Sequence, residues 1–255
     1  MATPFMSFVR SARAIRGKRT KMKTTLLVLT LNEIDGMREI MPRVQRDWVD
    51  QILISDGGST DGTLDYAREH GYQVYEQKRK GIRHGYNEVL DLIEGDIVIT
   101  FSPDGNSIPE LIPELIAKMN EGYDMVIASR YLDGAKSEDD NPITGFGNWF
   151  FTRTCNLLHG GHYTDAMVIY RAYKTHWFKD LDIDKDIGYR TPEFLFSTVM
   201  GIEPLLSVRA LKRNLKIAEI PGDEPKRVGG TPKLQVFRWG AGYYFQFWRE
   251  LFIWK

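Results

Sequence analysis

The chain has 255 residues, of which 42% are hydrophobic and 27% are charged, and its formal net charge is zero. This composition is that of an ordinary globular protein, long enough to bury a sizeable core without disulfides or structural metals. No apolar run reaches the roughly 20 residues that a membrane-spanning helix needs.

The charge is unevenly distributed along the chain. Seven of the 34 basic residues and no acidic residue lie within residues 1–23, so the remainder carries 27 basic residues against 34 acidic ones. A basic arm on an acidic body does not indicate a nucleic-acid groove, and we expect no nucleic-acid partner. The arm suits contact with anionic lipid headgroups. A solvated terminus explains it equally well, and an acid-free, Arg-rich start is also a weak feature of transit peptides.

The single cysteine, Cys155, cannot form an internal disulfide, so nothing indicates an oxidising compartment. We therefore expect a cytoplasmic protein. No nucleophile signature surrounds Cys155, and we interpret it as a small buried hydrophobic side chain.

Strand and helix patterns alternate from residue 24 to about residue 130. Residues 25–31 form a continuous apolar run, which is typical of a strand covered on both faces. Further strands are expected at residues 51–56, 73–76, 96–102 and 124–129, with helices near residues 35–46, 61–70, 84–94 and 109–120. The alternation predicts an α/β protein with a mostly parallel, Rossmann-like sheet and right-handed crossovers.

The pattern is looser after residue 131. It predicts an acidic loop over residues 133–142, helices over 144–158 and 190–202, a short strand over 216–220, a long loop rich in Pro and Gly over 219–233, and a terminal helix.

Polar residues follow four of the predicted strands. These strand ends carry Asn32 and Glu33, then Asp56 and Gly57, then Asp104, and finally Arg130. Ligands of open parallel sheets bind beyond the carboxyl ends of the strands. The convergence of acids, small residues and one arginine predicts a phosphorylated, hydroxyl-rich ligand at this edge.

Each of these groups has a chemical use and a plainer alternative. Asp56 can accept hydrogen bonds from a ribose or a base, and Gly57 permits a sharp turn; the alternative is a simple strand-to-helix turn. Asp104 with the amide of Asn106 can hold Mg²⁺ or Mn²⁺ against a diphosphate; the alternative is an Asp-Gly turn. Arg130 suits a phosphate, or an ion pair with the acidic loop.

These motifs resemble family 2 glycosyltransferases. TLNE (30–33), DGGSTDGT (56–63), SPDGN (102–106) and ASRY (128–131) occur in the order and spacing of that family. GYRTPEFLF (188–196) and EIP…KRVGGTPKL (219–234) are similar to the later motifs of dolichyl- and polyprenyl-phosphate glycosyltransferases, the dolichyl-phosphate mannosyltransferase type among them. The resemblance covers roughly residues 24–235 and implies the GT-A fold, a hexosyltransferase activity, and a UDP- or GDP-sugar donor.

The resemblance also implies roles for single residues. Thr30, Asn32 and Glu33 would line the nucleotide pocket, and Asp56 would hold the base or ribose. Asp104 would be the second acid of the Asp-x-Asp motif, with Asn106 facing the Mg²⁺ or Mn²⁺ ion. Arg130 would contact donor or acceptor phosphates. Arg227 and Lys233 belong to the long loop over residues 219–233, which we call the late loop, and they would close over the pyrophosphate. The alternative for that pair is a solvated basic loop.

Two positions depart from the family pattern. Ser102 stands where the first acid of Asp-x-Asp is expected, which removes one carboxylate from the metal site. The acceptor-side motif, usually Thr-Asp-Pro, has Ala166 after Asp165. These changes put the strength of metal binding and the nature of the acceptor in question.

The family mechanism is a single displacement that inverts the anomeric centre. A polyprenyl phosphate acceptor is already anionic and needs no protein base, whereas a hydroxyl acceptor needs a carboxylate to take its proton. Asp165 and Glu193 are the candidates for that base, and structural roles are the alternative for both. The competing functions are transfer to a hydroxyl of a glycan or lipid-linked glycan, and a catalytically weak nucleotide-sugar binding protein, which Ser102 suggests.

The terminal segment bears on the acceptor. Nine aromatic residues lie within residues 237–254 among several charged ones, a composition that suits the lipid–water interface better than a spanning helix. The alternative is a helix packed on its own domain or on a second subunit. We therefore expect a basic arm over residues 1–23, a GT-A domain over 24–235 and an aromatic amphipathic helix over 236–255, with peripheral contact to the cytoplasmic membrane face.

Overall fold

The computed structural model describes residues 22–229 and 236–254. Its centre is a seven-stranded sheet in the order β3-β2-β1-β4-β6-β5-β7. The strands are β1 (Thr24–Thr30), β2 (Gln51–Asp56), β3 (Gln73–Glu76), β4 (Ile97–Phe101), β5 (Met125–Ser129), β6 (Arg171–Lys174) and β7 (Ile217–Pro221). All neighbouring pairs are parallel except those that β6 makes with β4 and β5. The predicted α/β fold with a mostly parallel sheet is thereby confirmed.

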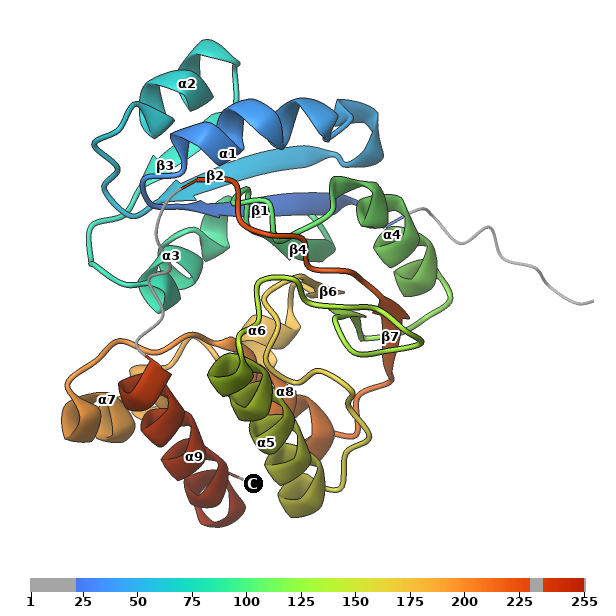
Figure 1. Cartoon of the computed structure of the whole chain (residues 1–255), viewed down its shortest axis with the longest axis vertical. Helices are drawn as coiled ribbons and strands as arrows, with labels where there is room; N and C mark the ends of the chain where they lie inside the picture. The colour runs from blue at the N-terminus through green and yellow to red at the C-terminus, as the bar shows by residue number, and fades with distance from the viewer. Residues whose placement is uncertain (1–21, 230–235, 255) are drawn as a thin grey trace, which may run out of the picture.

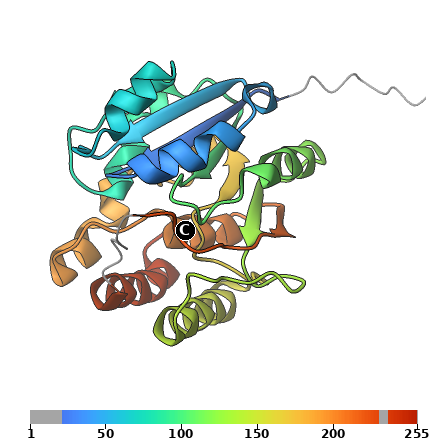
Figure 2. The same ribbon diagram turned by 45° about the horizontal axis from the view of Figure 1, so that its top comes forward.

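The helices connect these strands in the predicted alternation. The α-helices are α1 (Ile34–Glu39), α2 (Thr63–Glu69), α3 (Ile82–Glu88), α4 (Ile112–Asn120), α5 (Pro142–His159), α6 (Trp177–Asp180), α7 (Arg190–Phe196), α8 (Glu203–Lys212) and α9 (Val236–Phe252). Figure 1 shows α5, α7, α8 and α9 gathered on the side of the sheet away from α1 and α2, and Figure 2 shows the same separation after rotation.

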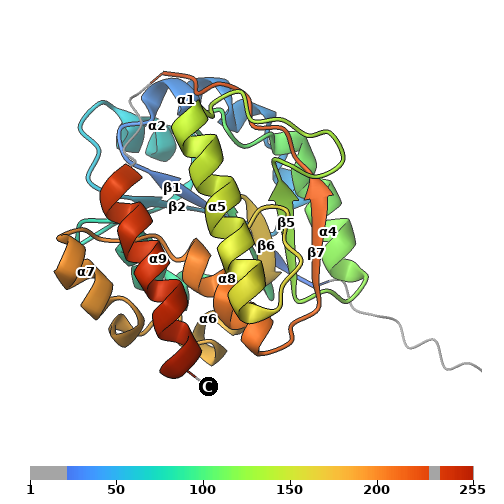
Figure 3. The same cartoon turned by 60° about the horizontal axis from the view of Figure 1, so that its bottom comes forward.

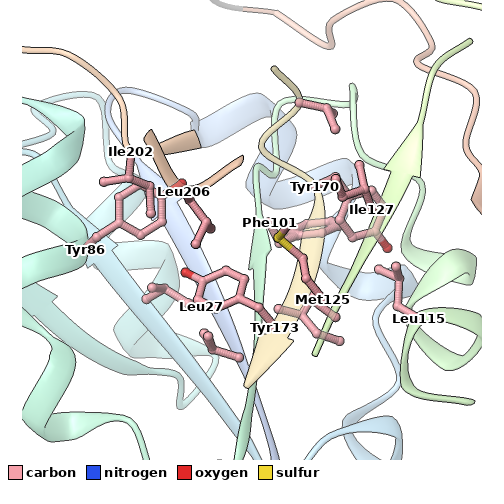
Figure 4. Close-up of a cluster of buried hydrophobic side chains, with 14 of the residues drawn as sticks. Leu27, Tyr86, Phe101, Leu115, Met125, Ile127, Tyr170, Tyr173, Ile202 and Leu206 are labelled. Carbon is pink, nitrogen blue, oxygen red and sulfur yellow. The ribbon is translucent and has the colours of Figure 1, made fainter. Parts of the chain in front are cut away.

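The hydrophobic core lies on both faces of the sheet. Every residue of β1 is buried, as its continuous apolar run predicts. Figure 4 shows Tyr86 and Leu206 on one side of β6, and Leu115 and Tyr170 on the other. All four are almost completely buried. Because the sheet is covered on both faces, a ligand can approach it at the ends of its strands.

Several elements of the structure differ from the prediction. The helix expected over 35–46 ends at Glu39. Short 3₁₀ turns follow it, and the first of them has a proline near its start. The helix expected over 190–202 ends earlier, because Ser197 adopts a left-handed conformation with φ of 49°. A separate helix, α8, follows it, and neither α8 nor the antiparallel strand β6 was predicted.

The terminal helix α9 begins at residue 236 and packs against α5, α7 and α8. Its Phe247 is fully buried, and the carboxylate of Glu250, which is completely inaccessible, pairs with Arg209 at 2.9 Å. No helix in the described part of the chain is long and apolar enough to cross a membrane. The expected basic arm lies outside the described residues, apart from residues 22 and 23.

Candidate active site

A cavity of about 1130 Å³ opens at the carboxyl ends of β1, β2, β4 and β5. Eight of the predicted site residues line it: Thr30, Glu33, Gly57, Asp104, Asn106, Arg130, Glu193 and Arg227. Asn32, Asp56 and Asp165 are not among its lining residues, and Lys233 lies outside the described residues. The strand order, helix α7 and the loop after β7 together bring to one cavity groups that are up to 197 positions apart in the sequence (Thr30 to Arg227).

Asp56 holds the turn after β2 and is fully buried. Its carboxylate accepts hydrogen bonds from Gly58 N at 2.9 Å, Ser59 N at 2.7 Å, Ser59 Oγ at 2.6 Å and Thr30 Oγ1 at 2.7 Å. A carboxylate with this many donors is oriented by its own loop. Asp56 therefore fixes the conformation of the turn whose residues Gly57 and Gly58 line the cavity.

Asn32 links the ends of β1 and β2. It has a positive φ of 54°, a conformation that asparagine tolerates better than most residues. Its side-chain Oδ1 accepts from Thr60 N at 2.8 Å, and its own N–H donates to Ser59 Oγ at 2.7 Å. The next residue, Glu33, faces the cavity and is almost completely buried.

Asp104 lies where the late loop crosses the end of β4. The segment that leaves β7 runs over the strand ends toward α1 in Figure 1, and Val228 N donates to Asp104 O at 2.7 Å. Arg227 Nη1 lies 2.8 Å from Asp104 Oδ2 and 3.7 Å from Glu33 Oε1. The guanidinium thus neutralises two carboxylates that belong to different strand ends.

The contact between this loop and β4 requires a glycine. Gly105 has a φ of +96°, and a Cβ placed on it would lie 2.8 Å from Val228 Cγ2 and 3.0 Å from Val228 N. Asn106 adds a second tie, because its Nδ2 donates to Pro225 O at 2.9 Å. The late loop is therefore held directly on the Asp104 turn.

The oxygens around Asp104 suit a hard divalent cation that also binds substrate. Asp104 supplies one carboxylate, and Asn106 and Ser102, which line the same cavity, supply neutral oxygens. In the described ranges, no cluster of three or more His, Cys, Asp and Glu side chains could hold a metal by itself. One carboxylate with few protein ligands is compatible with a divalent cation such as Mg²⁺ or Mn²⁺ that also binds the substrate phosphates.

Arg130, at the end of β5, is paired with two acids. Its Nε and Nη2 donate to Asp165 at 2.6 and 3.0 Å, and its Nη1 reaches Glu224 at 3.3 Å. Burial alone would lower the pKa of the Arg130 guanidinium, but the two acids raise it well above its ordinary value. Burial would likewise raise the pKa of Asp165, yet Arg130 holds it below the ordinary value. Asp165 is completely buried and does not line the cavity, whereas its partner Arg130 does.

Glu193 is engaged by another arginine. Its two oxygens accept from Arg83 Nε at 3.1 Å and Arg83 Nη2 at 2.8 Å, and Met200 N donates to it at 3.0 Å. Arg83 also contacts Asp186 at 2.6 Å. Glu193 therefore lines the cavity as one member of an ion-pair network that joins α3 to α7.

Five acids that line the cavity were not predicted as site residues, namely Asp139, Asp140, Glu203, Asp223 and Glu224, and two of them have raised pKa values. Glu224 faces Arg130 from the late loop, and burial raises the pKa of its carboxyl. Glu203 opens α8 and accepts a hydrogen bond from Tyr86 Oη at 2.7 Å; burial raises its pKa as well. The only sequence signal for Glu224 was its place in the late loop, and Glu203 carried none.

The site can be compared with known proteins. A family model described as Glycosyl transferase family 2 matches residues 25–182, more than half of the chain. The chain therefore belongs to this family, and the resemblance inferred from its motifs is confirmed.

Its relatives include sugar transferases whose names contain a polyprenyl phosphate. It is 27% identical to glycosyltransferase AglJ of Haloferax volcanii over 88% of this chain and 71% of that protein. It is also 27% identical to a dolichyl-phosphate hexose transferase of the same organism, over 83% and 86% of the two chains. An undecaprenyl-phosphate mannosyltransferase of Micrococcus luteus is 24% identical over 86% and 94%. The chain is accordingly a family 2 glycosyltransferase.

Solved structures bear out the fold. The glucosyl-3-phosphoglycerate synthase of Mycobacterium tuberculosis, in complex with Mn²⁺, UDP and phosphoglyceric acid, superposes with a TM-score of 0.64. The two proteins are 18% identical, and the match covers 91% of this chain and 79% of that one. At this identity the likeness establishes the GT-A fold alone.

Proposed function

We propose that the protein transfers a sugar from a UDP- or GDP-sugar to a polyprenyl phosphate, with inversion at the anomeric carbon. The observation that carries the proposal is the two-sided cavity. Its polar end is formed by the strand ends, with Thr30, Gly57 and Asp104. Phe151 of α5 and Tyr243 of α9 line the cavity from the side of these two helices. A sugar nucleotide fits the polar end, and the apolar wall suits the first part of a prenyl chain.

The reaction needs alignment and charge stabilisation more than proton transfer. An oxygen of the acceptor phosphate forms a bond to the anomeric carbon while the bond from that carbon to the diphosphate oxygen breaks. The leaving nucleoside diphosphate keeps the electron pair, and no proton moves. The Asp165 and Glu193 carboxylates, both already paired with arginines, are therefore not required as bases for this acceptor.

The leaving diphosphate must be neutralised. A divalent cation, Mg²⁺ or Mn²⁺, would supply positive charge and would be held by Asp104 and Asn106. Arg227, which lies at Asp104, would supply a further positive charge to the diphosphate. Lys233 is proposed to assist it. We further propose peripheral contact with the cytoplasmic membrane face, where the lipid acceptor is available.

The test is a transfer assay with the full chain. Labelled UDP- and GDP-sugars are supplied with polyprenyl phosphate, with glycan acceptors, or with no acceptor, in the presence of Mg²⁺ or Mn²⁺. Label that moves into the lipid fraction only with polyprenyl phosphate supports the proposal. Label that moves only to a glycan favours the hydroxyl-acceptor alternative, and donor binding without any turnover favours a binding protein.

Arg227→Gln should separate metal binding from transfer. Without the guanidinium, Asp104 is free for a cation, and Mn²⁺ affinity without donor should tighten about tenfold, equivalent to about 1.4 kcal/mol. Transfer should nevertheless slow by about tenfold or more, because a charge-assisted contact to the diphosphate is lost. Calorimetry with Mn²⁺ and the transfer assay measure the two effects.

The matched control for this prediction is Arg43→Gln, which removes an exposed arginine from its pair with Glu110. It should change neither quantity. Unchanged Mn²⁺ affinity in Arg227→Gln would contradict the assignment of Arg227 as the group that occupies the cation position.

A further inference from the structure

Three helices form one apolar face of the molecule. Helix α9 packs against both α5 and α7, and Figure 3 shows the three helices together on the face turned toward the viewer. Exposed apolar side chains occur on all three: Phe146 and Trp149 on α5, Phe194 and Leu195 on α7, and Tyr244 and Trp248 on α9. Phe194 is 81% exposed and Phe146 63%. We call these six residues the apolar face.

The aromatic rings of this face are continuous from one helix to the next. Phe150 stacks with Phe146 of its own helix at 6.1 Å between ring centroids, and with Tyr244 of α9 at 5.6 Å. Tyr244 in turn lies 6.3 Å from Trp248. The exposed rings of α5 and α9 therefore make a connected surface rather than scattered single residues, and surfaces of this kind mark interaction sites.

The charges on these helices are segregated by sign. The only acids in α5, α7 and α9 are Glu193 and Glu250. Both point inward, where they pair with Arg83 and Arg209.

The exposed charges of the same helices are Arg153, Arg190 and Arg238. A second copy of the chain would oppose these arginines to one another without an exposed acid on the helices to pair them. Anionic lipid headgroups would neutralise all three, and each basic residue near such a surface adds to binding.

The cavity extends to the helices that carry this face, although none of the six residues lines it. Ile143, at the start of α5, lines the cavity and is also 61% exposed. Phe151 on α5 and Trp239 and Tyr243 on α9 line the cavity between the same two helices. A chain that lies in a bilayer beneath the apolar face could enter the cavity between α5 and α9 without crossing water.

We propose that the apolar face docks on the surface of an anionic bilayer, with α5, α7 and α9 lying in the interface and the prenyl chain of the acceptor entering between α5 and α9. This placement rests on the proposed function for its acceptor, whereas the docking itself does not depend on catalysis. It differs from anchoring by the terminal helix alone, because α5 and α7 contribute exposed aromatic side chains and arginines of their own.

The test is co-sedimentation of the full chain with vesicles of phosphatidylcholine, alone or mixed with phosphatidylglycerol. The double variant F146S/W149S and the single variant Phe194→Ser carry no change in α9. The double variant should bind mixed vesicles about tenfold more weakly or worse, and Phe194→Ser should also weaken binding. The double variant Arg153→Glu with Arg190→Glu should lose binding to mixed vesicles while its weaker binding to neutral ones is unchanged.

Leu92→Ser is the matched control, since it removes an apolar side chain of 38% exposure outside these helices. It should bind vesicles as the wild type does, and thermal unfolding of all variants should be similar. Vesicle binding that is unchanged in F146S/W149S overturns the proposal. So does a wild-type protein that ignores both vesicles and forms a dimer which F146S/W149S dissociates, because a second copy would then cover the face.

Comparing sugar transfer to a soluble acceptor and to a vesicle-embedded acceptor tests this proposal separately from the proposed function. F146S/W149S should transfer sugar to a short, water-soluble prenyl phosphate as fast as the wild type, and should be slow only with acceptor embedded in vesicles. Equal slowing with both acceptors overturns docking as the role of the face. Vesicle binding by a wild type that transfers sugar to no prenyl phosphate supports docking and contradicts only the proposed function.

Discussion

Asp104→Asn should reduce sugar transfer by about two to three orders of magnitude, the usual cost of removing a main charge-stabilising group from an active site. The substitution keeps the size of the side chain and an oxygen that can accept from Asn106 N, as Asp104 does at 3.1 Å. It removes the one negative charge that the Asp-x-Asp position retains. Mn²⁺ binding should be lost together with activity, as measured by calorimetry and the transfer assay.

The converse change is Ser102→Asp, which restores the missing acid. Ser102 lines the same cavity, so a carboxylate there should tighten Mn²⁺ binding. If Asp104→Asn transfers sugar at the wild-type rate, or if the wild type is fully active in excess EDTA, the metal part of the proposal is wrong.

Asp165→Ala should destabilise the protein by about 3 kcal/mol or more, because it leaves a buried arginine without its closest partner. Arg130 retains only Glu224, whose oxygens are 3.3 and 3.4 Å away. Breaking an exposed pair costs far less, so Glu110→Ala, which frees Arg43, should change stability by about 1 kcal/mol at most. Urea unfolding at neutral pH measures both.

The pH dependence follows from the direction of the shift. Arg130 holds the pKa of Asp165 below its ordinary value. The stability that Asp165 contributes is then present above that ordinary value and is lost as pH falls through the lower, folded-state pKa. The difference between wild type and Asp165→Ala should therefore be largest near neutrality and should shrink in acid. Equal stability of the two proteins at neutral pH would contradict the structural role of the pair.

A variant that still folds distinguishes a structural role of Asp165 from a role as a base. If Asp165→Asn, examined at a temperature where it is folded, binds donor normally and is active with polyprenyl phosphate, Asp165 acts by positioning Arg130. Loss of transfer confined to hydroxyl acceptors would instead support Asp165 as a base for such acceptors.

Local sequence patterns were sufficient for the first half of the fold. The apolar run over residues 25–31 predicted β1 within one residue, because a strand buried on both faces must be apolar throughout. Asp56 and Asp104 were placed at strand ends for the same local reason. The strands after residue 131 were harder to predict. Strand β6 has only four residues, and it begins with the charged residue Arg171, which does not indicate a buried strand. The Arg171 side chain is nevertheless buried, and its Nε donates to Val168 O.

The sequence by itself determined the α/β class, the edge of the sheet at which the cavity opens, and the family motifs that stand there. Only the tertiary structure decided which charges meet. Arg83 and Glu193 are 110 residues apart, and Arg227 reaches Asp104 from a loop beyond β7. Such pairs depend on strand order and on the path of the late loop, and no local pattern encodes either. The same holds in part for the apolar face. The aromatic density of the terminal segment was evident from the sequence, but only the packing of α9 against α5 and α7 joins the exposed side chains of the three helices.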